Sequence, residues 1–126
     1  MSKMTKPKTN RDEKLDFEIQ FFEGVLKRRP DYIEAMIPLA EAYTRKGLYE
    51  RGLEIDRRLS TLCKKDPIVY YNLACSFALV GKKKEALTAL RQSIELGYSD
   101  FAHMRRDPDL KLLHEIILFK KMTKER

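Results

Sequence analysis

The sequence has few of the residues that form cross-links or metal centres. Its 126 residues include two cysteines and two histidines, with neither a CxxC pair nor a cluster of histidines. This composition argues against a disulfide scaffold and against a zinc module, and it favours a reducing compartment. A domain of this length buries roughly two-thirds of the surface of its unfolded chain, so it needs no cross-link. We therefore expect a single cytoplasmic domain.

The sequence also lacks long apolar runs. No stretch reaches the roughly 18 apolar residues of a transmembrane helix, and no apolar segment follows the basic residues at the start of the chain. Neither export nor membrane association is predicted. Residues 1–11 are polar and basic and contain no core residues, so we expect them to form a disordered tail.

Motifs of known enzyme classes are missing as well. The sequence contains no glycine-rich phosphate loop, no HExxH and no GxSxG. Cys63 and Cys75 have no adjacent histidine, and no carboxylate motif surrounds His103 or His114. Cys75 is expected in the middle of a helix, facing away from the packing stripe, where it is accessible but lacks a nearby cation to activate it. We expect no enzyme, no cofactor and no metal.

The charge is basic but spread out. Lysine and arginine total 26 against 19 acidic residues, a formal net charge of +7. The basic clusters fall near the ends of apolar-periodic segments, where cations complement helix C-termini or lie in turns. They are Lys27–Arg29, Lys64–Lys65, Lys82–Lys84 and Lys120–Lys121. This pattern favours solvated helix ends, so we expect no specific nucleic-acid partner.

What the sequence does contain is helical periodicity. Apolar residues recur three and four positions apart, and no alternating strand pattern occurs. The sequence therefore predicts an all-α chain, with a short turn at Asp100–Arg105. The expected helices are Asp12–Lys27, Asp31–Arg45, Tyr49–Cys63, Pro67–Val80, Lys83–Leu96 and Asp107–Met122.

The chain resembles itself when it is shifted by 34 residues. Large, small, aromatic and glycine positions coincide in the two copies, which indicates a repeated helix-turn-helix unit. The matching pairs are Met36 with Tyr70, Leu39 with Leu73, Ala40 with Ala74, Tyr43 with Phe77, Gly47 with Gly81, Gly52 with Ala86 and Leu53 with Leu87.

These residues resemble the tetratricopeptide (TPR) repeat. The pattern of a large residue, Leu-Ala and an aromatic appears in Met36–Tyr43 and again in Tyr70–Phe77. The resemblance implies a right-handed superhelical solenoid of antiparallel helix pairs. It divides the chain into a half repeat (12–29), repeat one (31–64), repeat two (67–97) and a capping helix (107–122). Repeat one departs from the pattern at Gly52, where alanine is usual, and at Asp56, where an apolar residue is usual.

The C-terminal half also resembles the terminating TPR segment of many bacterial TPR proteins. The resemblance rests on Tyr70–Cys75, Glu95–Tyr98 and Asp107–Leu110. It implies that Gly97 ends the last repeat and that residues 107–122 form a cap, which an open solenoid end requires.

TPR domains as a family bind proteins and peptides, so the resemblance implies a partner-binding groove. First-helix positions beside the packing stripe would line it. Those residues are Ile37, Glu41, Ile68, Tyr71, Asn72, Cys75 and Leu79. We expect Tyr71 to anchor the partner. Asn72 either clamps the backbone of an extended peptide or bridges to the neighbouring helix.

Two alternative functions stay open at this stage. The protein is a chaperone-like TPR protein that shields an amphipathic segment of a secreted or assembling partner, or it binds nucleic acid weakly through its basic edges. The carboxylate clamp of chaperone-binding TPR proteins is disfavoured, because Glu41 would repel a carboxylate.

The last helix carries two apolar faces, so it fills the groove, pairs with another chain or receives a partner helix. We expect a monomer or a weak homodimer.

Overall fold

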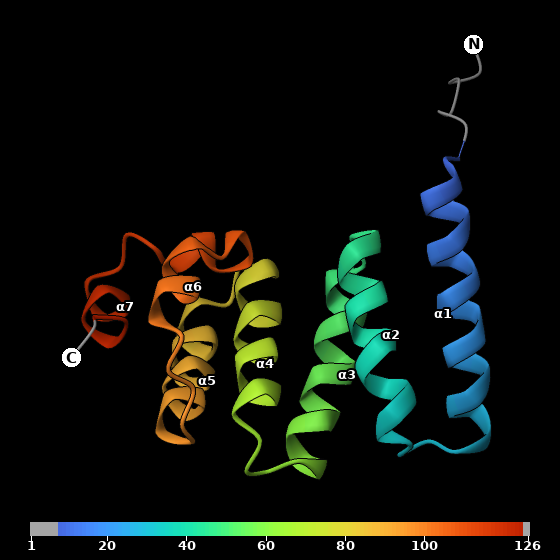
Figure 1. Ribbon diagram of the computed structural model, residues 1–126, viewed down its shortest axis with the longest axis horizontal. Coiled ribbons are helices and arrows are strands. Elements are labelled where there is room, and N and C mark those ends of the chain that lie inside the picture. The colour runs from blue at the N-terminus through green and yellow to red at the C-terminus, as the bar shows by residue number, and fades with distance from the viewer. Residues whose placement is uncertain (1–7, 125–126) are drawn as a thin grey trace.

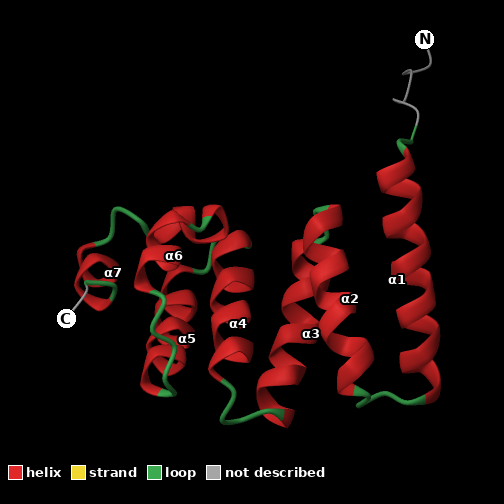
Figure 2. Cartoon of the chain, in the orientation of Figure 1, coloured by secondary structure: helices red, strands yellow, loops and turns green. Residues whose placement is uncertain are grey.

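The computed structural model describes residues 8–124, and these fold into helices joined by short loops, without a strand (Figures 1 and 2). The all-α prediction is confirmed, and the first five expected helices match within two residues at each end. The elements are α1 (Asn10–Arg28), α2 (Ile33–Lys46), α3 (Tyr49–Leu62), α4 (Pro67–Leu79), α5 (Lys83–Glu95), α6 (Phe101–Arg106), the 3₁₀ helix η1 (Pro108–Leu113) and α7 (Ile117–Met122).

The helices follow one another across the molecule in chain order (Figure 1). Each of α1 to α4 packs against the next helix, and η1 packs against α4, α5 and α6. The helices α2 and α3 form one hairpin and α4 and α5 form a second. The first helix, α1, stands at one end with α2 as its neighbour, and α7 lies at the opposite end. The groove described below lies between the two hairpins.

The two hairpins turn in the same way. Gly47 and Gly81 have φ angles of 85° and 84°, in the left-handed region that side chains disfavour. The residue after each glycine donates its amide hydrogen to a carbonyl five residues earlier, Leu48 to Tyr43 and Lys82 to Phe77. Such a bond is a common way to end a helix at glycine. The 34-residue self-match is therefore also a repeat of backbone geometry.

The hairpins are joined by a shared apolar interior. One cluster is formed mainly by α1, α2 and α3 and includes Val69 from α4. The other is formed by α4, α5 and the C-terminal elements and includes Leu53 from α3. Each cluster thus takes a residue from the other hairpin. Ala74 and Ala86 are fully buried where α4 and α5 approach each other, as expected for small residues at a close contact.

The N-terminal boundary differs from the prediction. Residues 1–7 of the expected disordered tail lie outside the described residues, but Asn10 and Arg11 belong to α1. The Thr9 side chain accepts a hydrogen bond from the amide of Asp12, and the Asp12 carboxylate accepts one from the Thr9 amide. This reciprocal cap starts the helix two residues earlier than its apolar pattern.

The prediction of one capping helix over Asp107–Met122 is wrong. The chain forms the 3₁₀ helix η1, leaves helical geometry at 114–116 and starts again as α7. A 3₁₀ helix repeats every three residues, so it aims Leu110 and Leu113 at the same side, where both are fully buried. The break then lets Phe119 enter the same cluster and leaves Ile117 71% exposed.

The outer face of α1 is open. Leu15 and Ile19 are buried against α2, whereas Phe17 and Phe21 are 69% and 56% exposed. No helix within residues 8–124 is both long and apolar enough to cross a bilayer.

The contact between α4 and α5 can be tested by overpacking. We expect Ala74→Leu or Ala86→Leu to lower the free energy of unfolding by about 1–3 kcal/mol, because neither site has room for the larger side chain. Urea denaturation followed by circular dichroism measures the change. Arg91→Leu, at an exposed position of α5, is the matched control. Unchanged midpoints for both alanine variants would contradict the close packing of this pair.

Candidate functional site

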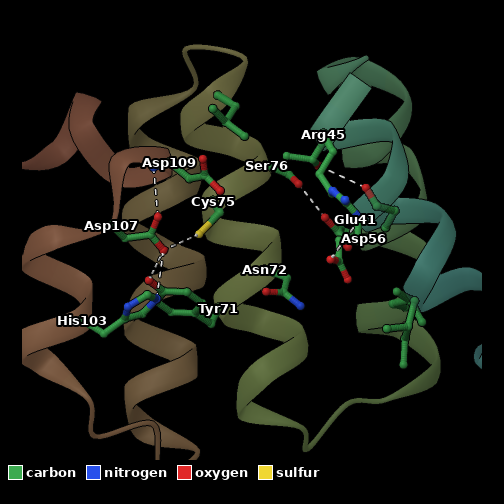
Figure 3. Close-up of a pocket in the computed structure, with 15 residues that line it drawn as sticks. Glu41, Arg45, Asp56, Tyr71, Asn72, Cys75, Ser76, His103, Asp107 and Asp109 are labelled. Atoms are coloured by element: carbon green, nitrogen blue, oxygen red, sulfur yellow. Dashed lines mark hydrogen bonds and ion pairs between the residues drawn. The ribbon is translucent and has the colours of Figure 1, made fainter. Parts of the chain in front are cut away.

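A groove of about 340 Å³ runs between α2 and α4, with α3 at its floor and the start of η1 at one end (Figure 3). Six of the seven predicted groove residues line it. Its lining consists of Ile37, Ala40, Glu41, Thr44, Arg45, Asp56, Leu59, Tyr71, Asn72, Cys75, Ser76, Leu79, His103, Asp107 and Asp109. No residue of α7 is among them, so α7 does not fill the groove.

Helical spacing places the accessible groove residues. Ile37 and Glu41 lie one turn apart on α2, and both are exposed. Asn72 projects from α4 on the other side and makes no hydrogen bond with another described residue, so nothing supports its bridging to a neighbouring helix. Leu79 is partly buried. Ile68 is 53% exposed but lies outside the groove lining.

Tyr71 is not the accessible anchor that the sequence suggested, and that expectation is wrong. The side chain is only 6% exposed. Its hydroxyl donates a hydrogen bond to Asp107 Oδ2 at 2.5 Å, and its ring stacks on Tyr98 with centroids 4.4 Å apart. Burial and this hydrogen bond to a carboxylate raise the pKa of Tyr71 above its ordinary value. Tyr71 therefore ties α4 to the C-terminal elements.

Asp107 is the centre of this attachment. Its Oδ1 atom accepts a hydrogen bond from the amide of Asp109, which caps η1. Its Oδ2 atom accepts from Tyr71 and lies 3.3 Å from Nε2 of His103 and 3.8 Å from Sγ of Cys75. No local signal in the sequence indicated that Asp107 would contact residues on α4.

Asp107 thus lies close to both a cysteine and a histidine, although the sequence showed no carboxylate motif around His103. The chemistry of an activated thiol is nevertheless disfavoured. Cys75 is 8% exposed, not accessible as expected, and burial together with the charge of Asp107 raises its pKa well above the usual value. A nucleophilic cysteine needs the opposite environment, one that stabilises the thiolate. The contacts of Asp107 fit a structural role.

Asp56 is the unusual residue of the groove. It is 5% exposed, and Ser76 Oγ donates a hydrogen bond to its Oδ2 atom at 2.5 Å. No ion pair joins it to any cation among residues 8–124. Burial raises its pKa to about 6. At the corresponding position, 34 residues later, the second hairpin has the fully buried Leu90.

The groove is acidic in a basic protein. Four carboxylates line it, and its basic groups are Arg45 and the imidazole of His103. Arg45 lies 3.9 Å from Glu41, and both side chains are exposed, so this pair contributes little to stability. Among the described residues, no three histidine, cysteine or acidic side chains come together as metal ligands.

Comparison with known proteins shows a distant similarity. No protein-family model matches the chain. The chain is 28% identical over 116 residues to a chloroplastic protein from Arabidopsis thaliana. The alignment covers 86% of this chain but 33% of the relative, so the chain spans about one third of that protein's length.

The attachment through Tyr71 can be tested by removing its hydroxyl group. Tyr71→Phe removes the hydroxyl and leaves the buried Asp107 with one fewer donor, so we expect a loss of about 1–3 kcal/mol in unfolding free energy. Chemical denaturation measures it, with Tyr49→Phe, at a residue that is 39% exposed, as the control. Equal stability of the two variants would show that the Asp107 contact does not hold the C-terminal elements in place.

Asp56 predicts a dependence of stability on pH. Its pKa rises from 3.8 in the unfolded chain to about 6 in the folded protein, so the folded state binds the proton more tightly. The stabilisation this gives is complete below pH 3.8 and is lost as the pH rises through 6. Between about pH 5 and 7 we expect the unfolding free energy of the wild type to fall by on the order of 1 kcal/mol relative to that of Asp56→Asn. If the melting temperatures of the two proteins change with pH in the same way, this assignment is wrong.

Proposed function

We propose that this protein is a TPR-like interaction module that binds a peptide or helix of a partner protein in the groove between α2 and α4. The observation that carries the proposal is the groove itself. It presents Ile37 and Asn72, which are exposed although they lie beside the packed interior. On one concave surface, an aliphatic group suits a side chain of a bound peptide, and an amide suits the backbone of the same peptide.

The TPR-like architecture is supported by the repeat of sequence and turn geometry. The Gly47 and Gly81 turns share their conformation, and α1 packs on α2 as the second helix of a preceding pair would. The C-terminal elements cover the far side of the last pair. We propose that they act as the cap of a right-handed solenoid.

Protein binding is favoured over the other candidate functions. The carboxylates along the groove would repel the phosphates of a nucleic acid. The buried, unactivated Cys75 argues against thiol chemistry. A chaperone-like role, shielding an amphipathic segment of a secreted or assembling partner, remains the second candidate, because Ile37 and Leu79 offer apolar surface in the groove.

The relative described above is chloroplastic, and a cytoplasmic location of this protein stays a prediction, as does a monomer or weak homodimer.

The groove can be tested against a matched surface residue. A partner recovered from nuclease-treated native extract is titrated against purified variants. We expect Ile37→Ala and Asn72→Ala each to weaken binding about tenfold, roughly 1.4 kcal/mol, while stability changes by no more than about 0.5 kcal/mol. Ile68→Ala removes a similarly exposed isoleucine outside the groove and serves as the control. If all three variants bind like the wild type, the partner binds elsewhere on the molecule.

A further inference from the structure

Asp56 carries a charge that the packing of the hairpin does not need. The corresponding residue of the second hairpin is Leu90, which fills the same kind of position with carbon alone. A buried carboxylate loses its hydration and is stabilised only by partners that replace it. One hydroxyl, from Ser76, supplies a single hydrogen bond to Oδ2, and no other described residue donates to the carboxylate. The site is therefore short of positive charge.

This carboxylate lies on the wall of the groove. Figure 3 shows Asp56 on the side of the α2–α3 hairpin, across the groove from Asn72 on α4. Arg45, the arginine of the lining, is paired with Glu41 instead. The other acidic groups, Asp107 and Asp109, add negative charge at the η1 end. A ligand entering here meets an acidic wall around an apolar strip.

The chemistry of the lining selects the kind of cation. A bare metal ion needs several ligands at one point, and the described residues offer no such group. A lysine or arginine has an aliphatic stem and a charged head, which suits a groove with Ile37 and Leu79 beside carboxylates. The amide oxygen of Asn72 offers one more acceptor for the same head group.

We propose that the partner segment bound in this groove carries a lysine or arginine whose cationic group pairs with Asp56. This inference rests on the proposed function and specifies its ligand. It explains why an acid occupies a core-like position in one hairpin, and it makes a basic, amphipathic segment the preferred partner.

Selection from random peptides tests the proposal without knowledge of the natural partner. A phage-displayed library of short random peptides is selected against the whole protein, and the synthetic peptides recovered are titrated by fluorescence anisotropy. We expect peptides that require Ile37 and Asn72 and that share a basic position. Replacing an arginine at that position with citrulline, or a lysine with norleucine, should weaken binding by about tenfold or more.

The protein variants isolate the charge of Asp56. Asp56→Asn keeps the shape and an acceptor for Ser76, and we expect it to bind the basic peptide about tenfold more weakly and to lose discrimination against the neutral peptide. Glu54→Gln removes an exposed charge from the same helix and should bind like the wild type. The peptide substitutions need no change in the protein, so they test the proposal even if Asp56→Asn folds poorly.

The outcomes separate this inference from the proposed function. Peptides that depend on Ile37 and Asn72 but have no basic position, or that bind Asp56→Asn as tightly as the wild type, would overturn the basic-segment inference and leave groove binding intact. Both proposals would be overturned if the recovered peptides bind Ile37→Ala and Asn72→Ala as tightly as the wild type, or if the selection recovers no peptide.

Discussion

The burial of α4 is the constraint on which the rest of the structure depends. This helix packs against α3 on one side and against α5 and η1 on the others. From Leu73 to Ala78 every residue is buried. Such a helix leaves one accessible strip, on which Asn72 is exposed. The same packing that joins the two hairpins therefore determines which part of α4 faces the groove.

Two aspartates beside this helix have opposite effects. Asp107 receives hydrogen bonds from Tyr71 and from the amide of Asp109, so its burial connects the C-terminal elements to α4. Asp56 receives one hydrogen bond and no counter-charge, and its pKa is raised to about 6. A carboxylate with several donors ties elements together, whereas a buried one with a single donor and no counter-charge is destabilising when it is ionised. Their difference lies in their partners, not in the residue type.

Local sequence signals predicted the elements well where local physics determines them. Gly47 and Gly81 marked the hairpin turns because only a glycine adopts their backbone conformation without strain. Apolar spacing located the first five helices. The prediction failed at residues 107–122, where an α-helical pattern was overridden by the need to bury Leu110, Leu113 and Phe119 in one cluster. Helix propensity is a small free energy beside the burial of three large side chains.

For the candidate site, the sequence by itself determined the direction of Ile37, Glu41 and Asn72, since helical periodicity and the repeat fix it, but the same reasoning placed Ile68 in the groove, and Ile68 lies outside its lining. The sequence did not determine which of the predicted groove residues are accessible. The exposure of Tyr71 depended on whether Asp107, 36 residues away, would reach its hydroxyl. Contacts between residues so distant along the chain are set by how the elements pack, and the tertiary structure alone decided that Tyr71 is part of the interior while Asp56 lines the groove without a counter-charge.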